Sequence, residues 1–158
     1  VAVQGIGGLG HLAIQYAARM GFRTVAISRG ADKAALAREL GAHEYIDTAV
    51  TGAAEGLQKL GGADLVLATA PSSAAMESTM GGLKPRGKLL IVAAAFEPMK
   101  VSAMGLLSGK TIAGWPSGSA IDSEDTMAFS ALTNVRPRVE TFPLERAEEV
   151  RRLGERRS

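Results

Sequence analysis

Short apolar runs alternate along most of this chain with longer stretches in which apolar residues recur every three or four positions. The short runs are typical of strands buried in a parallel sheet, and the longer stretches predict helices that cover such a sheet. From this pattern we expect strands over residues 1–3, 23–28, 44–47, 64–68, 88–93 and 111–113.

The helices between these strands have recognisable ends. Gly21 and Gly41 follow the first two, and Asp32 stands where it can cap the second. Six strands that alternate with helices predict an α/β fold, a doubly wound parallel six-stranded Rossmann sheet with helices on both faces. Further helices are expected over residues 53–60, 72–80 and 102–108, and a turn over residues 84–87.

The pattern changes towards the carboxyl end. We expect a helix from Ile121, a boundary at residues 134–137, a strand over residues 138–142 and a helix over residues 144–153. Residues 1–134 are interpreted as the Rossmann domain and residues 135–158 as a separate strand-helix segment. Because Val139, Phe142 and Leu144 have no evident partner, this segment should be displaced, mobile or paired with a neighbouring molecule.

The most informative motif directly follows the first strand, in the stretch Gly5-Ile6-Gly7-Gly8-Leu9-Gly10. Gly5 allows the tight turn, Gly7 lets a pyrophosphate approach the backbone, and Gly10 lets the next helix pack closely on the sheet. The N-terminus of that helix supplies unpaired N–H groups and a positive dipole end. A strand before the motif and a helix after it favour dinucleotide binding over a plain turn.

The end of the second strand indicates which dinucleotide is bound. An NAD site of this fold has Asp or Glu there to accept hydrogen bonds from the ribose. This chain has Ser28 followed by Arg29, with Lys33 one helical turn later. A hydroxyl and two cations suit a 2′-phosphate, so we expect NADP(H) rather than NAD(H). The missing carboxylate also disfavours a methyltransferase with a similar glycine turn.

Composition narrows the class of protein. A chain of 158 residues with 46% hydrophobic residues can bury its own core, and no stretch has the length of a membrane span. The net charge of +2 and the 4% aromatic content do not favour a nucleic-acid partner. The absence of cysteine excludes disulfides and thiolate metal sites, and it fits a cytoplasmic location.

Four stretches together resemble the cofactor domain of zinc-type medium-chain alcohol dehydrogenases, in particular the NADP-dependent bacterial and cinnamyl alcohol dehydrogenase branch. They are residues 5–15, 40–47, 87–89 and 111–114, and their order and spacing span nearly the whole chain. The resemblance implies an oxidoreductase that interconverts alcohols and aldehydes or ketones by hydride transfer at a nicotinamide, while zinc polarises the substrate oxygen.

The same resemblance implies further cofactor contacts. The pyrophosphate would be received by Gly7, Gly8, Leu9 and Gly10. The adenosine and ribose side would be lined by Thr69, Ala70 and Pro71, and the backbone that holds the nicotinamide carboxamide would come from Val92, Ala93, Ala94, Trp115, Pro116 and Ser117.

The zinc ligands of this family lie on a catalytic domain that precedes the glycine motif, and the resemblance implies that residues 135–158 would return to that domain, which we expect to be absent from this chain. The chain begins at Val1, so we expect it to be part of a longer protein, to have zinc only in that other domain, and to oxidise no alcohol by itself. His11 and His43 cannot replace those ligands, because a metal site needs three or four converging groups. An alternative is a stand-alone dinucleotide-binding sensor or assembly module without chemistry.

The resemblance also bears on partners. The expected partners are NADP(H) and, together with the other domain, a small alcohol or aldehyde. A homodimer is also implied, because family members pair through the sheet edge that follows the fifth strand. Residues 99–101 could supply this edge here.

Overall fold

The computed structural model describes residues 1–155 and contains one six-stranded parallel sheet. The strand order is β3-β2-β1-β4-β5-β6, so the predicted fold class is confirmed. Because β1 pairs with both β2 and β4, the topological switch point lies between β1 and β4, where ligands of this fold bind. The strands are β1 (Ala2–Gln4), β2 (Val25–Ser28), β3 (Glu44–Asp47), β4 (Ala63–Ala68), β5 (Leu83–Ile91) and β6 (Thr111–Gly114).

Helices cover both faces of the sheet, as predicted, and successive residues of a strand point to opposite faces. Val3 packs in one core with Ile14 of α1, and Ala2 packs in the other core with Leu57 of α3. The helical segments are α1 (Gly10–Arg19), α2 (Ala34–Glu39), α3 (Ala53–Lys59), α4 (Ser73–Glu77), η1 (Met80–Gly82), α5 (Ala103–Leu106), α6 (Ala120–Thr133), η2 (Leu144–Arg146) and α7 (Ala147–Glu155).

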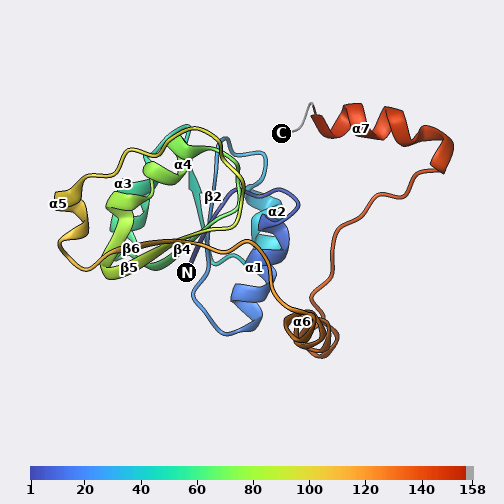
Figure 1. Ribbon diagram of the computed structural model, residues 1–158, viewed down its shortest axis with the longest axis horizontal. Coiled ribbons are helices and arrows are strands. Elements are labelled where there is room, and N and C mark those ends of the chain that lie inside the picture. Colours follow the sequence, from blue (N-terminus) through green and yellow to red (C-terminus); the bar gives the residue numbers. More distant parts are fainter. Residues whose placement is uncertain (156–158) are drawn as a thin grey trace.

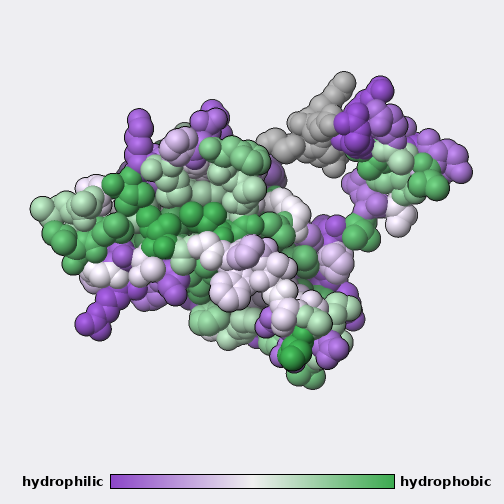
Figure 2. Space-filling view, in the orientation of Figure 1, coloured by the Kyte–Doolittle hydropathy of each residue, from purple (hydrophilic) through white to green (hydrophobic). Residues whose placement is uncertain are grey.

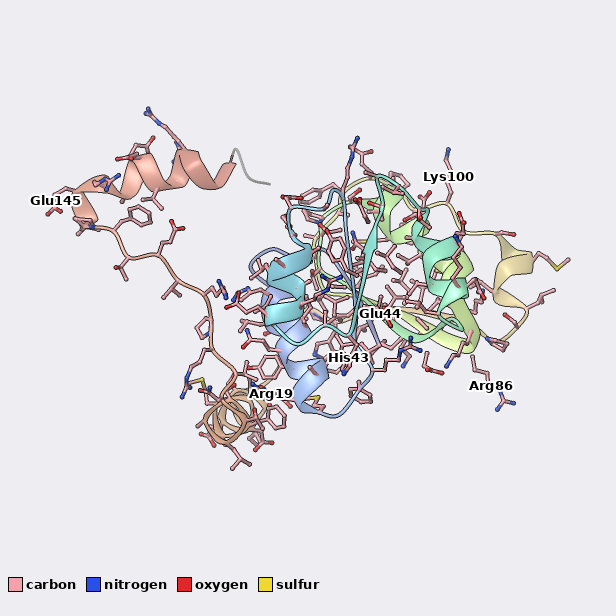
Figure 3. The ribbon with its side chains drawn as sticks, turned by 180° about the vertical axis from the view of Figure 1, so that it is seen from behind. Arg19, His43, Glu44, Arg86, Lys100 and Glu145 are labelled. Atoms are coloured by element: carbon pink, nitrogen blue, oxygen red, sulfur yellow. The ribbon has the colours of Figure 1, made fainter. Side chains whose placement is uncertain are left out.

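Three local predictions need correction. The strand over residues 138–142 is wrong, because a strand needs a hydrogen-bonded neighbour and no described strand pairs with them. Asp32 does not cap α2, which begins after Lys33 without a side-chain cap. The expected turn at residues 84–87 belongs to β5, where the pairing with β4 shifts register and Arg86 has a φ of 62°. The Arg86 side chain points away from the sheet (Figure 3).

The chain beyond α6 divides into a docked part and a free part. We call residues 1–114 the sheet body and residues 135–155 the C-terminal arm. Gln15 on α1 accepts from the Arg136 N–H at 3.1 Å and donates to its carbonyl at 2.9 Å. His11 Nε2 accepts from the Arg138 N–H at 3.1 Å. These bonds attach the start of the arm to α1.

The rest of the arm leaves the sheet body. Figure 1 shows η2 and α7 well apart from the sheet, and Figure 3 places Glu145 at the outer end of the arm. The predicted displacement is therefore confirmed for the arm beyond Arg138, whereas its mobility stays a prediction. The domain boundary after residue 134 also stays a prediction, and residues 156–158 of the predicted second segment lie outside the described residues.

The outer sheet edge after the fifth strand is β6 rather than residues 99–101. The latter form no strand, and the Lys100 N–H donates to Glu77 Oε1 at 2.7 Å. Figure 2 shows a broad band of hydrophobic residues across the sheet body on the side where β5 and β6 lie, in contrast to the mostly hydrophilic α7. The homodimer stays a prediction, with β6 as the edge available to it.

Candidate functional site

A cleft of about 920 Å³ opens at the carboxyl ends of β1, β2 and β4. This is the position that the doubly wound topology assigns to a ligand. Nine residues predicted from the sequence line this one cleft, although they come from separate parts of the chain: Gly5, Gly7, Gly8, Ser28, Arg29, Lys33, Thr69, Ala70 and Pro71.

Two glycines of the motif are required by the fold itself. Gly5 has a φ of +95°, which favours glycine, and a Cβ there would lie 2.8 Å from the Cβ of Ala70. A Cβ on Gly10 would collide with the carbonyl oxygen of Gly5. The Thr69 hydroxyl donates to the carbonyls of Gln4 at 3.0 Å and Gly5 at 3.1 Å, which fixes the turn against the end of β4.

The other two glycines are not explained by packing within the protein. Neither Gly7 nor Gly8 has a positive φ, and a Cβ built on either meets no atom within 4 Å. Both are exposed, and both line the cleft in front of the N-terminus of α1. A side chain at these positions would fill space that a pyrophosphate needs to reach the backbone N–H groups. The cleft therefore fits a dinucleotide.

The structure brings together the three residues expected to choose between the two dinucleotides. Ser28 ends β2, Arg29 is exposed directly after it, and Lys33 precedes α2 on the rim of the same cleft. Within residues 1–155, neither Arg29 nor Lys33 forms a salt bridge or a side-chain hydrogen bond. Both cations are available to an anion in the cleft.

The loop that carries Arg29 is held by the neighbouring strand β3. The Tyr45 hydroxyl donates to the Gly30 carbonyl at 2.5 Å, and Asp47 Oδ1 accepts from the Gly30 N–H at 2.7 Å. Burial raises the pKa of the Tyr45 hydroxyl, which keeps its proton in place for this bond. The loop next to Ser28 is thus held through both backbone polar groups of Gly30, its N–H and its carbonyl.

The remaining predicted residues lie elsewhere. Leu9 and Trp115 line a second, largely apolar groove of about 890 Å³ between α1, β4 and α6, and Thr69 borders both hollows. Gly10 is buried at the start of α1. Ala93, Ala94 and Ser117 line neither hollow.

Sequence reasoning missed several residues of the cleft. Thr48 follows β3 and reaches the site only because β3 is parallel to β2, so that their carboxyl ends meet at one edge. Gln4 had a visible signal, since it is the single polar residue of an apolar strand. The other missed lining residues are Ile6, Ile27, Ser72, Ala75 and Ser78.

Two further structural searches concern metals and membranes. Within the described residues, no three His, Cys, Asp or Glu side chains gather in a way that could hold a metal ion, so the family's zinc does not fit here. None of the described helices has the length and apolar character needed to cross a membrane.

Comparisons with known proteins agree with this geometry. The family described as zinc-binding dehydrogenase matches residues 8–133. The alcohol dehydrogenase patD of Penicillium expansum is 47% identical over 149 residues, which are 94% of this chain and 44% of that protein. An alcohol dehydrogenase of Geobacillus stearothermophilus is 36% identical over 152 residues, or 95% of this chain and 45% of that protein.

Solved structures give the same result. A cinnamyl alcohol dehydrogenase of Sorghum bicolor superposes with a TM-score of 0.83 at 28% identity, over 98% of this chain and 44% of that one. The alcohol dehydrogenase of Aeropyrum pernix gives a TM-score of 0.87 at 25% identity, over 98% and 46%. The chain spans less than half the length of the relatives that it matches, and that part is their cofactor-binding domain.

Proposed function

Because the chain belongs to the zinc-binding dehydrogenase family, we propose that it is the NADP(H)-binding part of an alcohol dehydrogenase that interconverts alcohols and aldehydes or ketones. The cleft at the switch point and the open backbone at Gly7 and Gly8 support dinucleotide binding. The observation that carries the choice of NADP(H) is Ser28 at the end of β2, beside Arg29 and Lys33.

The choice between the two dinucleotides is electrostatic. A carboxylate at the end of β2 would repel a 2′-phosphate, whereas Ser28 donates a hydrogen bond and two cations attract it. A hydrogen bond to a charged group contributes about 1.5–3 kcal/mol when sheltered, and we halve that value at this exposed rim. Two such contacts favour NADPH by about 1.5–3 kcal/mol, on the order of 10- to 150-fold. The Asp32 carboxylate beside Gly30 opposes them, so we expect the lower end.

The residues of this chain would bind and orient the cofactor rather than perform chemistry. The backbone at Gly7 and Gly8 and the N-terminus of α1 would hold the pyrophosphate. The groove beside Leu9 and Trp115 offers an apolar wall for the nicotinamide end. When bound, the nicotinamide supplies the hydride position. The described residues offer no metal site for the substrate oxygen, so we expect no alcohol oxidation by this chain alone.

Isothermal titration calorimetry with NADPH, NADH and S-adenosylmethionine tests this proposal. The unmodified chain should bind NADPH about 10- to 30-fold more tightly than NADH and should not bind S-adenosylmethionine. Arg29→Ala should remove most of the preference, because the phosphate loses one cation, and Ser28→Asp should reverse it. Arg19→Ala is the matched control, since Arg19 is an exposed arginine at the far end of α1 and does not line the cleft.

Two results would contradict separate parts of the proposal. Equal affinity for NADH and NADPH would remove the assignment of Ser28, Arg29 and Lys33 to a phosphate. Zinc-dependent alcohol oxidation by the purified chain would overturn the expectation that it has no activity alone.

A further inference from the structure

One buried polar group in the described part of the chain has no partner. The side chain of Gln4 is only 6% exposed, and its Oε1 is fully buried and accepts no hydrogen bond from residues 1–155. The neighbouring residues of β1, Ala2 and Val3, are apolar and completely buried. An unpaired buried carbonyl is destabilising, and because such groups are few in native proteins, this one needs a reason.

The position of Gln4 indicates what that reason is. Gln4 is the last residue of β1, directly before Gly5, and it pairs with Ile27 of β2 and Ala68 of β4. It shares a sheet face with Ala2, and this is the face covered by α3 and α4. Gln4 also lines the dinucleotide cleft, together with Ile27 and with Ala75 of α4.

This part of the cleft differs from the parts that suit phosphates. The phosphate-binding groups proposed above are the backbone at Gly7 and Gly8 and the cations Arg29 and Lys33. Apart from these two cations, the lining of the cleft is uncharged and includes Ile27 and Ala75. An uncharged carboxamide among apolar side chains suits a flat base that needs few directed hydrogen bonds.

We propose that the Gln4 carboxamide recognises the adenine base of the bound dinucleotide. A glutamine amide presents an acceptor beside a donor, and the adenine edge presents an amino donor beside a ring-nitrogen acceptor, so the two can form a matched pair. Because Oε1 is buried in the free chain, the carboxamide has to turn towards the cleft to form this pair, and binding then supplies the partner that Gln4 lacks. This inference rests on the proposed dinucleotide binding and adds a base-reading residue to it.

The test compares NADPH and NADH with their counterparts that carry hypoxanthine, in which a carbonyl oxygen replaces the adenine amino group. Calorimetry on the unmodified chain should show about 10-fold tighter binding of the adenine form, because one hydrogen bond is lost with hypoxanthine. Gln4→Leu should weaken the adenine form about 10-fold and abolish the discrimination. Gln58→Leu makes the same change at an exposed glutamine of α3 outside the cleft and should alter neither value.

Thermal unfolding without ligand gives a second measurement, in which Gln4→Leu should increase stability although it weakens cofactor binding. Because Gln4→Leu removes an unpaired buried oxygen, it should raise the melting temperature by about 2–4 °C while cofactor binding weakens. A purely structural glutamine would instead lower the melting temperature when replaced and leave the base preference intact. If Gln4→Leu does not fold, Gln4→Met, which keeps an unbranched side chain of similar length, provides the same measurement.

The possible failures are distinguishable. Absence of binding to both NADPH and NADH by the unmodified chain would overturn the proposed function. Tight binding of a dinucleotide with equal affinity for its hypoxanthine form, or a preference unchanged in Gln4→Leu, would overturn the role of Gln4 alone.

Discussion

The sheet body and the C-terminal arm place their apolar residues in opposite environments. In the body, Val3, Ile14 and Leu89 are completely buried between the sheet and its helices. In the arm, Val139 and Leu144 are 74% and 86% exposed. Both parts contain apolar residues at positions that predict strands or helices, yet beyond Arg138 the apolar residues Val139 and Leu144 find no packing partners within residues 1–155. The difference teaches that an apolar pattern predicts a tendency to pack, whereas burial depends on a surface to pack against.

We call residues 139–155 the outer arm. The ion pairs described there join residues close together in the sequence. Arg146 pairs with Glu149, and Arg151 pairs with Glu148, each within one helical turn. The Arg146 guanidinium also lies 5.4 Å from the ring centre of Phe142. Exposed pairs of this kind contribute little to stability. The fold of the body should therefore tolerate changes in the outer arm far better than changes at its own close contacts.

The largest expected effect is at Gly10. Gly10→Ala would force a methyl group into the Gly5 carbonyl, a backbone group that cannot move aside, and should lower the free energy of unfolding by about 3 kcal/mol. Gly7→Ala introduces the same methyl group into open space. It should change the free energy of unfolding by less than about 0.5 kcal/mol but weaken NADPH binding at least 10-fold. Urea denaturation and calorimetry measure the two quantities.

The reverse result would be informative. If Gly7→Ala destabilised the chain as much as Gly10→Ala, the openness at Gly7 would reflect a requirement of the fold, and the argument for a pyrophosphate there would fail.

A smaller effect is expected at Val135, the first residue of the arm, and almost none at Val139, which lies further along it. Val135 is 2% exposed and its N–H donates to the Ser130 carbonyl at 3.1 Å, whereas Val139 is exposed. Val135→Ala should lower the free energy of unfolding by about 1–2 kcal/mol, because two buried methyl groups are lost. Val139→Ala should change it by less than about 0.5 kcal/mol. Equal losses in urea denaturation would show that the outer arm packs on the body in solution.

The same contrast explains how much the sequence could predict. The six strands and the glycine-rich turn after β1 follow from patterns that the chain satisfies internally, since Val3 and Ile27 are strand residues with strands on both sides. The strand predicted over residues 138–142 was wrong, because strand pairing depends on a neighbour that the sequence pattern does not contain.

The start of α2 and the irregularity in β5 were harder to predict from the sequence. Asp32 has the side chain of a helix cap, but α2 starts later, and its carboxylate lies beside Gly30 instead. Pro85 and Gly87 are typical turn residues, yet both lie within β5, whose pairing with β4 shifts register there, and the Arg86 N–H donates to the Ser108 carbonyl. The place of Thr48 in the cleft follows from the parallel register of β2 and β3, which the sequence does not specify.

The smallest expected effect concerns α6, the helix that joins the body to the arm. Its start is stabilised locally by a capping box, in which Asp122 Oδ2 accepts from the Ser119 N–H at 2.6 Å and the Ser119 hydroxyl accepts from the Asp122 N–H. The Ser119 N–H, and then its hydroxyl, hold the pKa of Asp122 below its ordinary value of 3.8. A depressed pKa means that the contribution to stability is fully present above 3.8 and is lost as the pH falls through the lower, folded-state value.

Hydrogen exchange should therefore show that the first turn of α6 loses protection as the pH falls below about 4, before the strands of the body do. Asp122→Asn keeps an acceptor oxygen at the same place but does not titrate, so in this variant the pH dependence of the first turn should disappear. Asp125 lies on the same helix with no described hydrogen bond to its side chain, and Asp125→Asn should leave the dependence unchanged. Simultaneous loss of protection in α6 and in the sheet would mean that the helix is stabilised by the body rather than by its own cap, and the boundary between body and arm would then lie further along the chain.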